Sequence, residues 1–148
     1  MKKTIIIAVV IIVVLFTGIM FVARVLYPTN IADTAPDQVE EKLRSRHYQT
    51  DLKTFTAETE KLIPSLSTYG QNWKYMTTES TESSALIKAE VPVVVFTDDL
   101  QIKAEKDAAS GGINVNVHSN SRVGQSDLGE NRRHVLQILE ALDKKFAK

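Results

Sequence analysis

Cysteine is absent from this chain of 148 residues. Its absence excludes disulfide bonds, thiolate metal sites and an N-terminus that carries lipid on a cysteine. It is compatible with an oxidising compartment, where a cysteine-free domain needs no redox chemistry.

The recurrent motifs of catalysis and cofactor binding are missing as well. No GxSxG nucleophile elbow, P-loop or dinucleotide fingerprint occurs in the sequence. His47, His118 and His134 lack the close partner spacing of a metal site such as HExxH, so we interpret each as solvent-facing or structural. The sequence therefore predicts no cofactor, no metal site and no catalytic residue of a known type. An unfamiliar enzyme stays as the minor alternative.

An excess of basic residues is also missing. The chain holds 18 basic and 18 acidic residues, and all of the acidic ones follow the first two dozen residues. All of the basic residues except Lys2, Lys3 and Arg24 do so too, so the larger part of the chain is slightly acidic. Proteins that bind nucleic acid usually carry a basic stripe, and we therefore predict no nucleic-acid partner.

What the sequence does have is one long uncharged run over residues 4–23, TIIIAVVIIVVLFTGIMFVA. A helix needs about 20 mostly apolar residues to cross the hydrocarbon core of a bilayer. We interpret residues 1–26 as a transmembrane anchor, with the membrane contacted through residues 4–23. The alternative is a signal peptide cleaved near Ala32. The apolar region of a signal peptide is shorter, however, and Phe21, Val22 and Arg24 stand where its small-x-small site would be expected.

Flanking cations predict the orientation of this anchor. Lys2 and Lys3 precede the run, whereas Arg24 is the only basic residue between the run and Lys42. The positive-inside bias therefore places the N-terminus in the cytoplasm and the rest of the chain outside it. We predict a single-pass protein of the cell membrane with an extracytoplasmic C-terminal domain, periplasmic in a Gram-negative cell.

A linker is predicted over residues 27–38, because this stretch has two prolines, small residues and no apolar period. Fully extended, residues 27–37 reach no more than about 40 Å, so the domain over residues 39–148 is expected to work close to the membrane surface. Its roughly 110 residues suffice for one modest hydrophobic core.

Two amphipathic helices are predicted in this domain. Thr50 or Asp51 caps the first, whose apolar face is bent or ended near Pro64. The last helix is clearer, because its apolar residues follow the i, i+3, i+4, i+7 spacing of one helix face. These residues are Val135, Ile138, Leu139, Leu142 and Phe146.

Period-two alternation predicts half-buried antiparallel strands in the middle of the chain. A first short strand lies within residues 43–49, and alternation follows over residues 73–77, 85–91, 100–105 and 113–118. Pro92 indicates an edge or a break, and Asp98-Asp99 suggests a turn or a bulge. We predict an α+β fold, a small two-layer sandwich in which two helices pack on an antiparallel sheet.

A polar, glycine-containing segment joins the last strand to the last helix and holds the candidate functional residues. They are Ser121, Arg122, Gly124, Ser126, Asp127, Gly129, Asn131, Arg132 and Arg133. The free amides of a helix start, together with the three arginines, could hold a phosphate or a carboxylate. In the structural alternative, Ser126 or Asp127 caps the helix, Asp127 and Glu130 form a capping box, and Arg122 pairs with Asp127.

This segment resembles the signature of domain-of-unknown-function family 1499, a Ser-Arg-x-Gly-x-Ser-Asp-x-Gly-x-Asn run that here spans residues 121–131. Residues 96–100 and the strand over residues 113–118 fit the family too, and the resemblance covers about residues 43–146. One departure is His134, where the family pattern implies arginine. The resemblance implies an envelope or membrane-associated domain and brings no activity, cofactor or catalytic residue with it.

Three hypotheses about function follow. The first is a non-catalytic binding or interaction module of the cell envelope, whose partner is an envelope protein or a ligand near the membrane. It predicts an exposed apolar patch on the free face of the sheet. The second is a binder of anions or lipid headgroups at residues 121–133. The third, an enzyme, requires one cleft that gathers Asp98, Asp99, His118 and Ser121.

Overall fold

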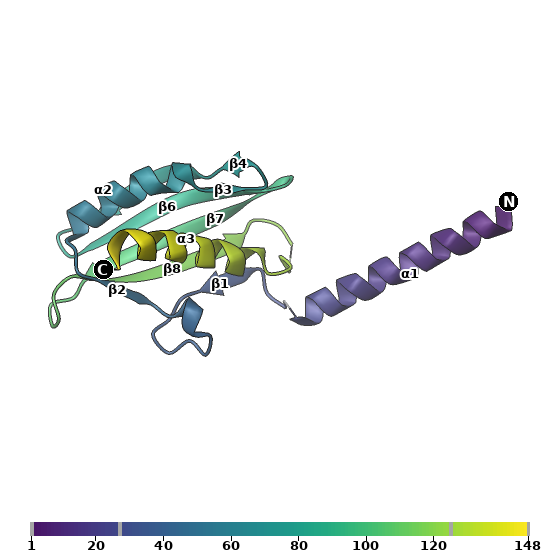
Figure 1. The fold of residues 1–148 in the computed structure, drawn as a ribbon, viewed down its shortest axis with the longest axis horizontal. Coiled ribbons are helices and arrows are strands. Elements are labelled where there is room, and N and C mark those ends of the chain that lie inside the picture. The colour runs from purple at the N-terminus through teal and green to yellow at the C-terminus, as the bar shows by residue number, and fades with distance from the viewer. Residues whose placement is uncertain (1, 27, 125, 148) are drawn as a thin grey trace.

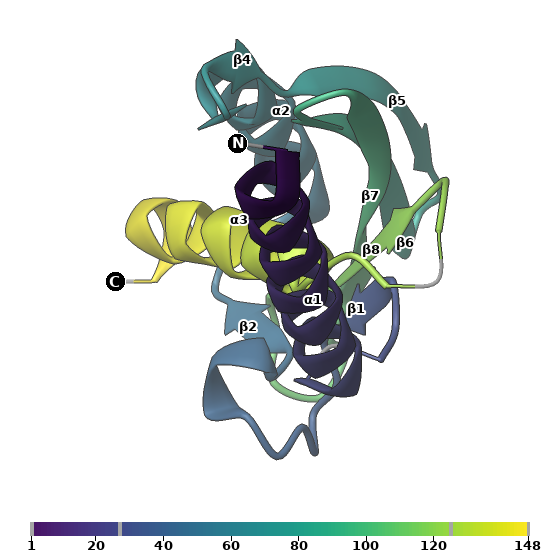
Figure 2. The ribbon, with the colours of Figure 1, turned by 90° about the vertical axis from the view of Figure 1, so that its right-hand side faces the viewer.

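The structure is a computed structural model that describes residues 2–26, 28–124 and 126–147. Its N-terminal helix α1 (Lys2–Leu26) extends away from a folded domain in which two helices lie on one face of a sheet (Figure 1). The view along α1 shows the helix layer and the sheet layer side by side (Figure 2). The predicted α+β architecture is confirmed.

Helix α1 is long and apolar enough to span a membrane. Its apolar window has a mean hydropathy of 3.3, and none of that window is buried against the rest of the chain. A rise of about 1.5 Å per residue makes a helix of 25 residues longer than the bilayer's hydrocarbon core of about 30 Å. The bare apolar surface distinguishes α1 from the core helix of a globular domain, which buries its apolar residues.

The main sheet has the strand order β1-β8-β7-β6-β5, and all of its ladders are antiparallel. The strands are β1 (Ile31–Asp33), β5 (Lys74–Ser80), β6 (Ser84–Val93), β7 (Phe96–Lys106) and β8 (Ile113–Ser121). Strand β2 (Arg46–Tyr48) pairs with the same edge of β8 as β1 does, but at the opposite end of that edge. A short hairpin of β3 (Ser67–Thr68) and β4 (Gln71–Asn72) stands apart from this sheet.

Helices α2 (Leu52–Leu62) and α3 (Glu130–Phe146) cover one sheet face and close the core. Asp51 caps α2 as predicted, since its carboxylate accepts the Thr54 amide at 2.8 Å. A short 3-10 turn (Ile63–Ser65) follows α2 at Pro64, and another (Glu41–Leu43) precedes β2. The apolar positions that alternate on β6, β7 and β8 are buried beneath α2 and α3, as the sequence pattern predicts.

Two local predictions are wrong or incomplete. The segment predicted as a linker over residues 27–38 contains β1, because the polar edge of β8 accepts a short strand that has no apolar period of its own. Asp98-Asp99 is not a turn but lies inside β7, with Asp98 buried and Asp99 on the other face. The chain turns instead at Val94–Val95, two residues with no turn-forming chemistry.

Two further irregularities are local. A bulge between Tyr75 and Thr77 shifts the β5 register, so that Thr77 is exposed and the predicted alternation ends there. Pro92 lies in β6 beyond the last residue paired with β5, and it pairs only with Thr97 of β7. This placement agrees with the edge position predicted for Pro92.

The turn between β7 and β8 offers a matched test of the fold. Gly111 and Gly112 both have positive φ, at 73° and 75°. A Cβ on Gly112 would lie 2.3 Å from the Tyr48 carbonyl oxygen of β2, whereas a Cβ on Gly111 would meet nothing within 4 Å. Gly111→Ala is expected to cost about 1–2 kcal/mol for its left-handed backbone, and Gly112→Ala about 1–3 kcal/mol more for the clash. Urea unfolding followed by Trp73 fluorescence measures both, and equal losses would contradict this packing of β2 on the turn.

Candidate functional site

The polar segment that carries the family signature borders a pocket. This loop pocket has a volume of about 380 Å³ and lies between the β6–β7 turn, the β3–β4 turn and the segment that leads into α3. Among its lining residues are the signature residues Ser121, Gly124, Ser126 and Asp127. Val93, Phe96, Val123 and Leu128 form apolar walls, whereas Asp98 and Glu130 add carboxyl groups.

The Asn131 side chain connects three segments of the chain next to the loop pocket. It is fully buried. The amide oxygen accepts a hydrogen bond from the Ser119 hydroxyl at 2.6 Å. The amide nitrogen donates to the Ser121 hydroxyl at 2.8 Å and to the Asn30 carbonyl at 2.9 Å. One side chain therefore joins the start of α3, the end of β8 and the segment before β1.

Asp127 fixes the path of the chain into α3. One carboxylate oxygen accepts the Gly129 amide at 2.9 Å, and the other accepts the Asn131 amide at 2.7 Å. The helix itself begins at Glu130, after Gly129 in the left-handed conformation at φ 86°. The prediction that Ser126 or Asp127 is the N-cap is wrong, because Gly129 holds that position. The Asp127 carboxylate nevertheless accepts an amide of the first turn from two residues upstream of the N-cap.

Asp98, His134 and Glu130 form a line of titratable side chains beneath the pocket. His134 is fully buried, with its Nδ1 3.5 Å from the Asp98 carboxylate and its Nε2 3.5 Å from that of Glu130. These distances exceed a good hydrogen bond. Both ring nitrogens and Asp98 Oδ2 are buried with no hydrogen-bond partner. Such groups cost free energy in a folded protein and mark a site that calls for explanation.

Burial shifts the protonation of this cluster. It raises the pKa of Asp98 to about 6, a rise that a hydrogen bond from Ser121 opposes and the nearby Asp127 and Glu130 charges reinforce. Burial lowers the pKa of His134 to about 4. Tyr69 donates a hydrogen bond to Glu130 at 2.8 Å, which raises the pKa of the phenol. The site is thus acidic and weakly solvated, and its histidine is neutral near pH 7.

The three signature arginines do not line the loop pocket, and they bind separate carboxylates instead of converging. Arg122 binds Asp99 at 2.6 Å and Glu90 at 2.7 Å on the opposite sheet face, so the predicted Arg122–Asp127 ion pair is wrong. Arg132 binds Glu40. Arg133 pairs with Glu130, and its guanidinium lies 5.0 Å from the centroid of the Tyr69 ring. This geometry does not favour the anion-binding alternative.

The four residues that the enzyme hypothesis requires are divided between two faces. Asp98 and Ser121 are register partners at the pocket. Asp99 pairs with Arg122 on the other face, and His118 lies 2.6 Å from Asp33 there. We therefore set aside the cleft that this hypothesis predicted. Within the described parts of the chain, no cluster of three His, Asp or Glu side chains is arranged to hold a metal ion.

Apart from Leu86, the free face of the middle strands is polar, which also bears on the first hypothesis. Its middle strands present Lys88, Glu90, Gln101, Lys103 and Asn116. The apolar patch predicted for this face is therefore not there. Exposed apolar side chains gather instead at the turns around the loop pocket.

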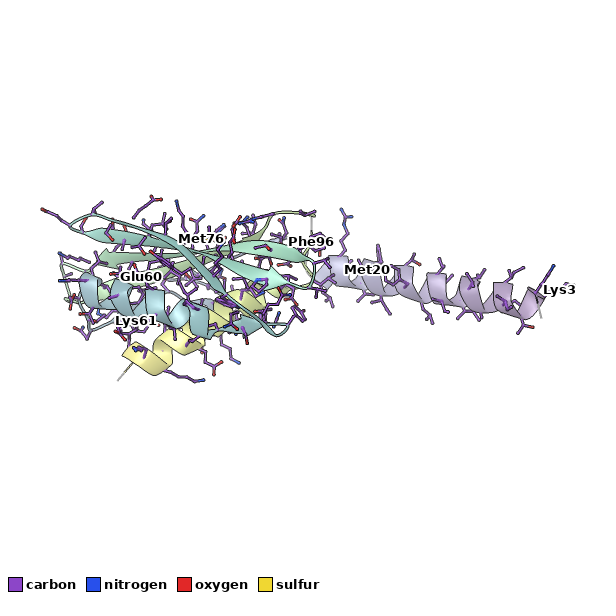
Figure 3. All side chains as sticks on the ribbon, turned by 90° about the horizontal axis from the view of Figure 1, so that it is seen from above. Lys3, Met20, Glu60, Lys61, Met76 and Phe96 are labelled. Carbon is purple, nitrogen blue, oxygen red and sulfur yellow. The ribbon has the colours of Figure 1, made fainter. Side chains whose placement is uncertain are left out.

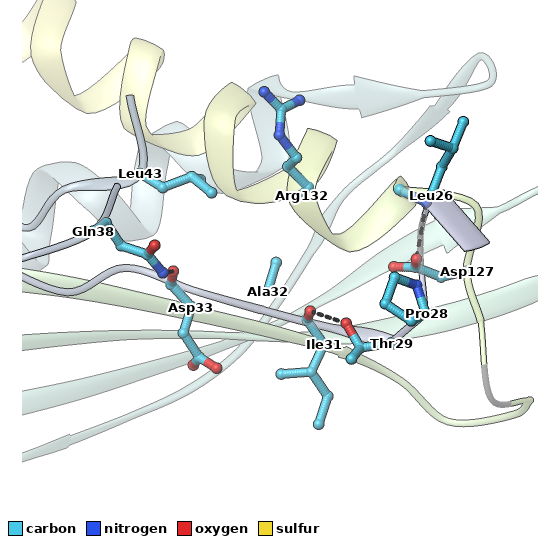
Figure 4. A pocket seen from close by; sticks show the side chains of 11 residues that line it. Leu26, Pro28, Thr29, Ile31, Ala32, Asp33, Gln38, Leu43, Asp127 and Arg132 are labelled. Carbon is cyan, nitrogen blue, oxygen red and sulfur yellow. Dashed lines mark hydrogen bonds between the residues drawn. The ribbon is translucent and has the colours of Figure 1, made fainter. Parts of the chain in front are cut away.

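A second pocket lies where α1 meets the domain, and its volume is about 510 Å³ (Figure 4). Leu26, Pro28 and Ile31 line it together with Asp127 and Arg132. The polar groups in it are engaged, because Asp127 accepts backbone amides and Arg132 binds Glu40. The loop pocket is the better candidate, since the unpartnered buried groups lie beneath it.

His134 is the residue that sequence reasoning missed. We interpreted it as solvent-facing or structural, yet it lies in the core beside the pocket, edge-on to Trp73 at 6.0 Å between ring centroids. A signal was available. Asn131 and His134 extend the apolar stripe of α3 by one turn towards its N-terminus, at the same i, i+3, i+4 spacing. Polar residues on a buried stripe indicate a buried polar site.

The fold and the site define a small α+β domain with one open antiparallel sheet, preceded by a helix long enough to span a membrane. A family model described as "Protein of unknown function (DUF1499)" matches residues 25–142, and the chain belongs to this family. The predicted family resemblance is confirmed. A comparison with curated proteins gives no match.

The opposed shifts at Asp98 and His134 predict an unusual pH dependence. A buried Asp98 with a raised pKa makes the folded protein less stable as the pH rises from about 4 to 6. A buried His134 with a lowered pKa makes it less stable as the pH falls from about 6.5 to 4. These two effects of pH on the free energy of unfolding largely cancel in the wild type.

Asp98→Asn removes the pH dependence of stability that Asp98 causes and leaves the one that His134 causes. Relative to the wild type, the variant is expected to gain stability at pH 7 and to lose about 3 kcal/mol more between pH 6.5 and pH 4. Urea unfolding at several pH values, followed by Trp73 fluorescence, measures the difference between the two proteins. Parallel pH profiles would contradict the buried titratable pair.

Proposed function

We propose that this chain is a membrane-anchored, non-catalytic binding module whose ligand site is the loop pocket. The observation that carries the proposal is that Asp98 Oδ2 and both His134 ring nitrogens are buried without hydrogen-bond partners beside a pocket lined by residues of the family signature. Natural proteins keep such strained polar groups mainly where function uses them. Helix α1 supports the anchoring by its length and hydropathy.

The topology proposed for the anchor follows the flanking cations. Lys2 and Lys3 on the N-terminal side favour a cytoplasmic N-terminus, and the domain then lies on the extracytoplasmic side of the cell membrane. In this arrangement α1 stays attached and keeps the domain at the membrane surface.

The chemistry of the loop pocket indicates the class of ligand. Asp98, Asp127 and Glu130 line it, and no basic side chain does so among the described residues. A carboxylate or phosphate would meet like charge there, whereas an amine could donate hydrogen bonds to Asp98 and Glu130. The apolar walls suit a short hydrocarbon body. We infer a ligand with an apolar body and a cationic, hydrogen-bond-donating head.

Pentylamine, pentanol and pentanoate are matched probes for this inference. With the full chain in phosphatidylcholine nanodiscs, pentylamine is expected to shift the NMR amide signals of Gly124 and Leu128 at lower concentration than either other probe. The double variant Asp98→Asn, Glu130→Gln is expected to weaken pentylamine binding by about tenfold, since loss of a charged partner costs roughly 1.4 kcal/mol or more. Binding of pentanol should change little.

Glu105→Gln is the control variant, because Glu105 lies at the other end of the sheet on the free face. It should bind pentylamine like the wild type. Tighter binding of pentanoate than of pentylamine would overturn the acidic site and favour the anion-binding alternative at Arg122, Arg132 and Arg133. Failure of all three probes to shift the pocket signals would contradict a ligand pocket of this kind.

A further inference from the structure

Exposed apolar side chains surround the mouth of the loop pocket. Four of them, Tyr69, Phe96, Val123 and Leu128, line the pocket itself, and the β6–β7 turn adds two neighbours. In the folded domain, few other large apolar side chains are as exposed, and Val95 is the extreme in this group at 79%. We define the apolar rim as Tyr69, Val94, Val95, Phe96, Val123 and Leu128.

The backbone of the rim is as unusual as its side chains. Among residues 2–26, 28–124 and 126–147, the non-glycine residues with positive φ are Tyr69, Val94 and Leu128, at 52°, 46° and 57°. All three belong to the rim. Asparagine and glycine are the residues that favour this conformation in turns, and a β-branched residue such as valine strongly disfavours it. The chain thus carries apolar side chains at turn positions where local preference opposes them.

The anchor places the rim at the membrane. Helix α1 ends at Leu26, and β1 begins at Ile31, which pairs with Asn120 next to the pocket. The chain between these points spans no more than about 20 Å when fully extended. Seen from above, Phe96 lies at the end of the sheet that adjoins α1 (Figure 3). The turn at Asp107–Gly112 lies at the other end of β7 and β8.

The ion pairs around the apolar rim indicate which force can drive its contact with a membrane. Arg122 and Arg133, the arginines next to it, are paired with carboxylates on the domain itself. Attraction to anionic headgroups is therefore weak here, and burial of apolar surface is the main driving force that the rim offers.

We propose that the apolar rim docks onto the bilayer that holds α1, so that the loop pocket opens at the lipid interface. The docking rests on the anchoring proposed above, but it does not depend on whether the pocket holds a ligand. Insertion of the turn tips among the lipid headgroups removes their apolar surface from water. That gain offsets the conformational cost of the left-handed apolar residues.

The cysteine-free sequence makes a direct test possible. Single cysteines are introduced by Phe96→Cys and Val123→Cys in the rim, Ala109→Cys at the far end of the sheet and Leu15→Cys in α1. Each full chain is labelled with an environment-sensitive fluorophore and reconstituted in phosphatidylcholine vesicles that contain lipids with a quencher on the acyl chain. Quenching at the two rim positions is expected to be several times stronger than at Ala109→Cys.

A second variant separates docking from anchoring. Val94→Asp places a charge at the turn tip, and aspartate tolerates the left-handed conformation better than valine does. It is expected to abolish quenching of a label at Val123→Cys while quenching at Leu15→Cys persists. Val39→Asp is the matched control, because Val39 is an exposed valine outside the rim. Trp73 emission reports whether each variant is folded.

The outcomes are distinct. If the Leu15→Cys label is not quenched, the proposed anchoring fails and docking fails with it. If that label is quenched but the rim labels match Ala109→Cys, the anchor stands and the docking proposal is overturned. Rim labels that are shielded without lipid quenching, in proportion to protein density in the vesicle, would overturn it in favour of contact between copies of the chain.

Discussion

The buried side-chain amide of Asn131 is the interaction on which the arrangement of the site depends. It bonds to Ser119 and Ser121 of β8 and to the Asn30 carbonyl before β1. A buried amide left unpaired would cost about 1–3 kcal/mol, so this set of bonds allows few alternative positions for the start of α3. With α3 held there, the Asp127 carboxylate accepts an amide of its first turn, and Glu130 and His134 come to lie beside Asp98.

The site combines this fully bonded network with groups that lack partners. Ser121 belongs to both, because it accepts from Asn131 and donates to the Asp98 carboxyl. Asp98 and His134 are buried without adequate bonds, and the apolar rim above them has left-handed residues. Departures from local preference concentrate where proteins bind and act, and here they gather at one end of one sheet. That coincidence supports the proposal that the pocket and the rim serve one function at the membrane.

Much of the fold could be predicted from the sequence, because its periodicities are clean. The stripe from Val135 to Phe146 and the alternation from Ala85 to Val91 each allow one amphipathic arrangement. The errors arose where local chemistry opposes the structure. Val94–Val95 forms a turn without turn residues, and this displaced the predicted turn to Asp98-Asp99. Strand β1 is specified by the edge of β8 rather than by its own residues.

The segment predicted as the candidate site borders the loop pocket, but its contacts were only partly predicted. Composition and the family signature indicated residues 121–133, and Asp127 bonds to the start of α3, although Gly129 and not Asp127 is the N-cap. The partners of Arg122 depend on the register of β6, β7 and β8, which local sequence does not reveal. The same holds for His134, whose buried neighbours Asp98 and Trp73 come from distant strands and turns.

A double-mutant cycle between Asn131→Ala and Ser119→Ala tests the central claim most directly. Urea unfolding of the full chain, the two single variants and the double variant gives the coupling free energy between these side chains. If the Asn131 network holds α3 on β8, the coupling is expected to be about 1 kcal/mol or more, with the double variant less affected than the sum of the single ones. Additive losses, within about 0.5 kcal/mol, would contradict it.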